Sequence, residues 1–136
     1  MRCITVPATE EDPIPVIEFV EEQLSPYDCS RKALYQIEIA IEEIFVNIVR
    51  YSGLPADDGV EICCEVLEDP LRMTLRFRDG GTPFDPLAAG DPDISPEALE
   101  AREGGLGIFM VKQMMDSVSY AYEDGKNTLT LLKSLG

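Results

Sequence analysis

The sequence predicts one α/β (α+β) domain, a two-layer sandwich in which helices cover one face of a sheet that is mixed or mainly antiparallel. Three observations support this fold class. The predicted segments follow in the order strand, two helices, two strands, long loop, helix, two strands. One of the helices is apolar around most of its circumference, which is typical of a helix buried between layers. A length of 136 residues with 45% hydrophobic content suits a single domain with a substantial core, which we assign to residues 1–136.

In the N-terminal half, residues 2–6 are expected to form an edge strand. Asp12 precedes a proline suited to a first helical turn, so its carboxylate can cap a helix that ends near Leu24. A longer helix follows, with Asp28 or Ser30 as its cap. The apolar side chains of this long helix recur at helical spacing: Ala33, Leu34, Ile37, Ile41, Ile44 and Ile48.

The C-terminal half combines two pairs of predicted strands with a long loop and one helix. The loop, 79–103, is rich in glycine, proline and aspartate and has one short helical candidate at Ser95. Loops of this length in a compact domain are usually functional or disordered. The other predicted elements are strands at 60–68 and 71–78, a helix at 106–115, and strands at 117–123 and 127–133.

The formal charge of −15 narrows the choice of partners. Nucleic acids and anionic membranes reward surface lysine and arginine, so we expect neither as a partner and favour a basic protein. No apolar run reaches the roughly 20 residues of a membrane span. The first residues, Met1 to Pro7, are typical of a strand rather than a signal peptide. We therefore expect a cytoplasmic protein.

Cysteine and histidine content limits the possible chemistry. The cysteines lack metal-ligand spacing, and we interpret Cys3, Cys29, Cys63 and Cys64 as buried or half-buried thiols. If their segment is a strand, Cys63 and Cys64 point to opposite faces. The chain has no histidine, which excludes a Ser-His-Asp or Cys-His catalytic arrangement and any histidine autophosphorylation within it.

Two polar residues, Glu43 and Asn47, stand four positions apart on the long helix and so share one face. One interpretation is a solvated polar edge on a buried helix. The other is functional: Asn47 supplies a neutral oxygen to Mg²⁺, which needs few protein ligands, and Glu43 handles a proton beside a terminal phosphate. This segment alone leaves both interpretations open.

Asp79 ends a predicted strand directly before Gly80 and Gly81. Asp-Gly-Gly is also typical of a plain turn. In a functional interpretation, the carboxylate accepts a hydrogen bond from an exocyclic amine such as that of adenine, and the glycines let the base lie against the backbone. Thr128, early in the last strand, is a further candidate to add a hydroxyl near Asp79.

Three glycines within four residues, Gly104, Gly105 and Gly107 around Leu106, open the apolar helix that follows. They can form a simple turn, or they can let the backbone approach a phosphate, whose charge suits the positive end of a helix dipole. The segment is not a Walker A loop, because no Gly-Lys-Ser/Thr follows. It is not a Rossmann fingerprint either, because the glycine spacing and the preceding strand differ. A nucleotide site of a third kind is needed.

The three segments in this order resemble the N box, first glycine box and second glycine box of the GHKL ATPase superfamily. Within it, the chain is most similar to the bacterial anti-sigma factor serine-protein kinases, over nearly its whole length. The similarity is closest in Asp79-Gly-Gly-Thr-Pro-Phe-Asp-Pro and in Gly104-Gly-Leu-Gly-Ile-Phe-Met-Val-Lys-Gln-Met-Met-Asp, and it continues through Tyr120 and residues 126–129. It departs at Tyr51, where family members often carry histidine, and the role of Tyr51 stays open.

This resemblance implies ATP and Mg²⁺ as cofactors and a role for each segment. Asn47 would hold Mg²⁺, Asp79 would read adenine, and Glu43 would be the general base. Residues 86–103 would form a lid, in which Arg102 either contacts the γ-phosphate or a partner, or is simply solvated. The residues expected to contact the nucleotide are Asn47, Asp79, Gly81, Gly104, Gly105, Leu106, Gly107 and Thr128.

The implied activity is transfer of the γ-phosphoryl group of ATP to a serine or threonine of a STAS-domain anti-anti-sigma factor, together with sequestration of a sigma factor. A homodimer is also expected from the family. The alternative from another class is a non-catalytic module in which bound ATP orders the lid and so selects a partner. Glu43 beside Asn47 favours the kinase, because a module released from catalysis can lose the glutamate.

Overall fold

The computed structural model describes residues 1–8, 12–51, 53–54, 58–88, 95–97 and 107–136. The strands form a five-stranded sheet in the order β1-β2-β3-β5-β4, and each neighbouring pair is antiparallel. They are β1 (Arg2–Pro7), β2 (Gly59–Leu67), β3 (Arg72–Asp79), β4 (Ser117–Glu123) and β5 (Lys126–Ser134). The predicted fold class is confirmed, with the sheet antiparallel rather than mixed.

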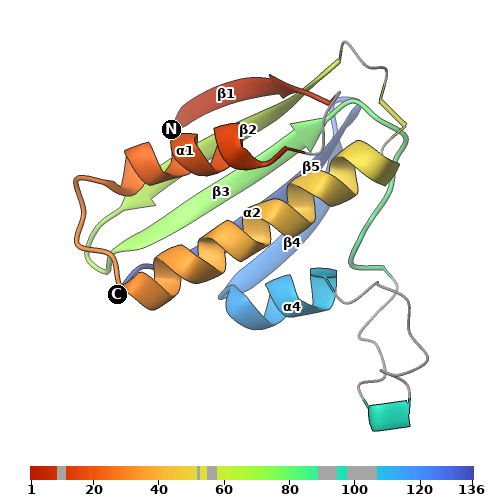
Figure 1. The fold of residues 1–136 in the computed structure, drawn as a ribbon. Helices are drawn as coiled ribbons and strands as arrows, with labels where there is room; N and C mark the ends of the chain where they lie inside the picture. The colour runs from red at the N-terminus through yellow and green to blue at the C-terminus, as the bar shows by residue number, and fades with distance from the viewer. Residues whose placement is uncertain (9–11, 52, 55–57, 89–94, 98–106) are drawn as a thin grey trace.

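The helices α1 (Ile14–Leu24), α2 (Arg31–Tyr51) and α4 (Gly107–Met114) lie on one face of this sheet (Figure 1). α2 crosses the middle of that face, α1 packs beside it against β1 and β2, and α4 packs against α2 and β4. Ser30 caps α2, because its hydroxyl accepts a hydrogen bond from the backbone N–H of Ala33 at 3.1 Å. In the part of the chain that the structure describes, no helix is long and apolar enough to cross a membrane.

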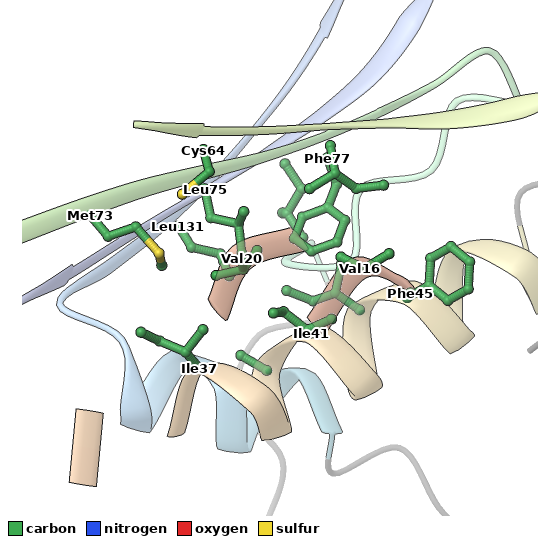
Figure 2. Packing of buried hydrophobic residues seen from close by; sticks show 14 of the residues in the cluster. Val16, Val20, Ile37, Ile41, Phe45, Cys64, Met73, Leu75, Phe77 and Leu131 are labelled. Carbon is green, nitrogen blue, oxygen red and sulfur yellow. The ribbon is translucent and has the colours of Figure 1, made fainter. Parts of the chain in front are cut away.

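The core fills the space between the helices and the sheet (Figure 2). Ile37, Ile41 and Phe45 recur along one stripe of α2, and each is 2% exposed or less. Alternate residues of β3 face the helices: Met73, Leu75 and Phe77. Burial of one such side chain stabilises the fold by about 1.5–3 kcal/mol. This packing therefore holds α2 and β3 in a fixed relation, and the polar residues discussed below lie at one end of it.

The interpretation of all the cysteines as free thiols is wrong. Cys3 and Cys63 lie directly opposite each other in the register of β1 and β2, and they form a disulfide. Cys64, the next residue along β2, belongs to the core, so the prediction that Cys63 and Cys64 point to opposite faces is confirmed. Burial raises the pKa of the Cys64 thiol to about 11. Cys29 is a half-buried thiol, as predicted.

Candidate nucleotide-binding site

A pocket opens between the C-terminal half of α2, the end of β3 and the start of α4. It contains about 420 Å³ of empty volume, counting the open space at its mouth. Asn47 of α2, Asp79 of β3 and Ile108 of α4 all line it, so three segments distant in sequence meet here. The rest of the lining is apolar apart from one amide and one phenol: Ile44, Ile48, Phe77, Phe84, Pro86, Tyr120, Asn127 and Leu129. An apolar pocket with a few convergent polar groups suits a planar ligand such as a nucleobase.

Asp79 is the buried acid of this pocket. It ends β3 and is 4% exposed. Its Oδ1 accepts hydrogen bonds from the backbone N–H of Gly81 at 2.9 Å and from the side-chain amide of Asn127 at 3.1 Å. These bonds offset the cost of burying a carboxylate. Within the described residues both bonds fall on Oδ1, which leaves Oδ2 for a ligand.

Glu43 and Asn47 lie on one face of α2 but at different depths. Asn47 is half-buried and lines the pocket, whereas Glu43 is exposed. The carboxylate of Glu43 lies against Gly107, the first residue of α4, so closely that a Cβ at position 107 would overlap the Oε2 of Glu43. A larger residue at position 107 would therefore require the Glu43 side chain to move. The partial positive charge at the N-terminal end of α4 favours a carboxylate or a phosphate nearby.

Several of the expected site residues lie outside the described residues: Arg102, Gly104, Gly105, Leu106 and most of the predicted lid at 86–103. From the lid segment, Pro86 lines the pocket. Gly81 is half-buried, and its N–H is bound to Asp79. Tyr51 is 63% exposed at the end of α2 and is not part of the lining. Its role stays open.

The expectation that the Thr128 hydroxyl lies near Asp79 is wrong. In the register of β3 and β5, Asp79 is opposite Asn127, and Thr128 is opposite Arg78. Because successive side chains of a strand point to opposite faces, Thr128 points away from the helices. Its Oγ1 is buried and has no hydrogen-bond partner among the described residues. The sequence carried a usable signal, since counting two residues back from Leu129, which faces the core, reaches Asn127.

Asn127 is the site residue that sequence reasoning missed. Its Nδ2 donates to the buried carboxylate described above, to the carbonyl oxygen of Thr82 at 3.0 Å and to that of Gly81 at 3.4 Å. Its Oδ1 accepts hydrogen bonds from the Phe84 backbone N–H at 3.0 Å and from the Tyr120 hydroxyl at 2.5 Å. The loop that follows β3 is thereby fastened to β5 and, through Tyr120, to β4.

The chain resembles known proteins along most of its length. The family model described as Histidine kinase-like ATPase domain matches residues 6–133. Serine-protein kinase RsbW of Listeria monocytogenes serotype 4a (strain HCC23) is 33% identical over 100 residues, which cover 71% of this chain and 63% of RsbW. Serine/threonine-protein kinase BtrW of Bordetella bronchiseptica is 26% identical over 102 residues, covering 75% of this chain and 71% of BtrW.

A solved structure shares the fold. The RsbU and RsbW domains of Rv1364c from Mycobacterium tuberculosis superpose with a TM-score of 0.68 at 18% sequence identity, over 98% of this chain and 32% of that one. At this identity the likeness concerns the fold alone. The present chain thus spans only part of these proteins, about 63% of the length of the RsbW relative.

Proposed function

The chain belongs to the family of histidine kinase-like ATPase domains, and we propose from this premise that it transfers the γ-phosphoryl group of ATP to a serine or threonine of a partner protein. One observation carries the proposal, the convergence of three segments. Asn47 and Asp79 line one pocket, and Glu43 lies against Gly107 at the start of α4. Sequence relatives named as serine or serine/threonine kinases support the reaction class.

The adenine base is proposed to occupy the apolar part of the pocket. There Oδ2 of Asp79, which has no hydrogen bond among the described residues, accepts a hydrogen bond from the exocyclic amine. A buried acceptor of this kind discriminates strongly, because a ligand without the matching donor leaves it unpaired. The backbone proposed to surround the nucleotide is that of Gly81, Gly104, Gly105, Leu106 and Gly107.

The residues present also fit a magnesium ion. Asn47 offers an amide oxygen on the pocket wall, on the same helix face as Glu43. Magnesium keeps most of its ligands as water and phosphate oxygens, so a single protein oxygen is sufficient. The bound ion would supply neutralisation of the negative charge on the phosphates.

Glu43 is the proposed general base. The partner's hydroxyl oxygen bonds to the γ-phosphorus, the bond from that phosphorus to the bridging oxygen breaks, and the Glu43 carboxylate takes the hydroxyl proton as ADP leaves. The exposure of Glu43 suits this role, because a side chain of another protein has to reach it.

The partners are proposed from the resemblance to anti-sigma factor kinases. A STAS-domain anti-anti-sigma factor would be phosphorylated, and a sigma factor would be held afterwards. Phosphorylation adds close to two negative charges to the first partner, and the charge of −15 on this chain then opposes rebinding. The same charge suits basic surfaces of a sigma factor. This role places the protein in the cytoplasm, and a homodimer is proposed on the same resemblance.

Intact-mass analysis of a STAS-domain protein encoded near this one, after incubation with this chain and Mg-ATP, tests the proposal. The wild type is expected to add one phosphoryl group. Glu43→Gln is expected to lower the transfer rate by about 10²–10⁴-fold, the usual contribution of a positioned base, with little change in ATP affinity.

Glu42→Gln is the matched control, because Glu42 is the neighbouring exposed acid on α2. Phosphoryl transfer by Glu43→Gln at the wild-type rate would contradict the assignment of Glu43 as the general base. If the wild type binds ATP and transfers nothing, the non-catalytic ATP-gated module becomes the better explanation.

A further inference from the structure

The amide of Asn127 is held in one orientation. The residue is 7% exposed, and both ends of its amide are engaged. Its Oδ1 faces the Phe84 backbone N–H and the Tyr120 hydroxyl. A backbone N–H can only donate, so reversing the amide would place donor against donor. The NH₂ group must therefore face the Asp79 carboxylate.

This orientation determines how Asp79 presents its second oxygen. Asp79 and Asn127 are register partners on neighbouring strands, so their side chains lie on the same face. Oδ1 is fixed by two donors, the Asn127 amide and the Gly81 N–H. Because Oδ1 is held, the carboxylate cannot rotate, and Oδ2 points in one fixed direction. The same amide holds the loop over the pocket through the carbonyl of Thr82.

We propose that Asn127 is a positioning residue that fixes the Asp79 carboxylate and the loop 80–84 so that the pocket selects a base with an exocyclic amine at that carboxylate. The inference rests on the proposed ATP site. Adenine presents a donor there, whereas guanine in the same pose presents a carbonyl, an acceptor against an acceptor. A carboxylate free to turn, or a loop free to shift, would let guanine move until its own N–H groups reach Asp79. Fixing both prevents that adjustment.

Tyr120 supports this arrangement from β4. Its hydroxyl is one of the two donors to Asn127 Oδ1. Burial is the main cause that raises the pKa of the Tyr120 phenol, so the group remains a donor at neutral pH. Removing this hydroxyl leaves Asn127 in place with one anchor fewer, which predicts a smaller effect in the same direction.

The test measures ADP and GDP affinities by isothermal titration calorimetry for the wild type, Asn127→Leu and Thr130→Val. Leucine keeps the branched outline and the number of side-chain heavy atoms of asparagine and removes its hydrogen bonds. We expect the ratio of ADP to GDP affinity to fall about tenfold or more in Asn127→Leu, the effect of losing one fixed hydrogen bond at the base. At saturating ATP, kcat should stay near the wild-type value while KM for ATP rises. Thr130, on β5 opposite Arg76 on the other sheet face, is the control and should leave the ratio unchanged.

A folded Asn127→Leu protein, with its thermal unfolding midpoint close to the wild type, that keeps the wild-type ratio would overturn the inference. Should that variant not fold, Tyr120→Phe decides instead. A ratio lowered by about two- to fivefold would support the inference, as expected for one partly compensated hydrogen bond, and an unchanged ratio would overturn it. A wild type that binds neither nucleotide at millimolar concentration would remove the proposed function as well. If the wild type prefers ADP over GDP and Asn127→Leu shows the same preference, only the role of Asn127 is contradicted and the proposed function stands.

Discussion

The two halves of the sheet are held together in different ways. At the β1 and β2 edge, the Cys3–Cys63 disulfide joins the outermost strand to its neighbour. In the half formed by β3, β5 and β4, the loop 80–84 is held by hydrogen bonds that converge on Asn127. The strand residues that line the pocket all come from this second half.

This difference implies that the free energy of unfolding and the affinity for a nucleotide depend on different parts of the sheet. A covalent link opposes unfolding whether or not a ligand is bound. The geometry around Asp79 instead depends on hydrogen bonds that each contribute about 0.5–1.5 kcal/mol. Changes at the disulfide edge should therefore alter unfolding and leave nucleotide binding intact, and changes around Asp79 should do the reverse.

The largest expected effect is the loss of stability when the disulfide is removed. The bond joins residues separated by 60 positions, and for a loop of that length the chain-entropy relation predicts a loss of about 4 kcal/mol in the free energy of unfolding. Cys3→Ser measured by urea denaturation should show this loss, with ADP affinity changed by no more than about twofold because the sites are independent.

Reductant provides the matched control for that measurement. Adding it should destabilise the wild type by the same amount and leave Cys3→Ser unaffected. A thiol titration of the unfolded, non-reduced wild type should detect two free thiols, those of Cys29 and Cys64. Four reactive thiols would contradict the disulfide.

The next effect in size is on nucleotide affinity, from Asp79→Asn. The amide of asparagine has the shape of the carboxylate, but its NH₂ group donates hydrogen bonds. This NH₂ group stands either where the carboxylate accepts from Gly81 and Asn127 or where it would accept from the base. The Kd for ATP is expected to rise about 100-fold, or roughly 2.7 kcal/mol. Calorimetric titration measures it, with Asp124→Asn as control, since Asp124 is exposed in the β4 and β5 turn at a φ of 53° that asparagine tolerates. An affinity within threefold of the wild type would contradict the role of Asp79.

A smaller effect is expected at the other end of the site, from Gly107→Ala. The new Cβ would overlap the Glu43 carboxylate, which is the flexible end of its side chain and so moves away. The transfer rate should fall about tenfold, a typical cost of displacing a catalytic group by a short distance, while helix α4 is not weakened because alanine favours helix. If Glu43 is the group affected, Gly107→Ala adds little loss to Glu43→Gln. Two fully additive losses would show that Gly107 acts through something else.

The local features of this fold were predictable from sequence. Helical spacing of apolar residues located α2, and Ser30 was among its predicted caps. Proline and glycine turns separated the strands, and each strand boundary lies within about two residues of its predicted place, the usual uncertainty of such limits. Such signals succeed because they depend on neighbouring residues only.

Both errors of prediction have a single physical cause, the register between strands. The partner of Cys3 is Cys63, and the partner of Asp79 is Asn127, which took the place expected for Thr128. A shift of one residue in register moves every side chain to the other face. Register depends on packing between segments far apart in the chain. Alternation within β5 could have shown that Asn127 shares the face of Leu129, but spacing within one segment does not identify the residue that pairs with it across the sheet.

The smallest expected effect is a pH dependence carried by Tyr120. Burial is the main cause that raises its pKa above the ordinary value of 10.0, the charges of Asp85 and Asp79 add to it, and a hydrogen bond with Phe84 acts against it. The unfolded chain therefore loses the phenol proton at a lower pH than the folded chain. The hydrogen bond to Asn127 contributes its full stabilisation below about pH 10, and this is lost as the pH rises through the folded pKa.

The difference in unfolding free energy between the wild type and Tyr120→Phe should accordingly be constant between about pH 7 and pH 9 and shrink above about pH 10. Urea denaturation at several pH values measures it, and Tyr35→Phe is the control, because Tyr35 is 65% exposed on α2 and is not among the groups that shift the Tyr120 pKa. A Tyr120→Phe difference that persists unchanged at high pH would contradict this titration, because the contribution of the hydroxyl would then not depend on its proton. No difference at any pH would mean that the ring packing, which phenylalanine keeps, and not the hydroxyl, supports Asn127, and the hydrogen-bonded half of the sheet would then be held by shape as much as by polar contacts.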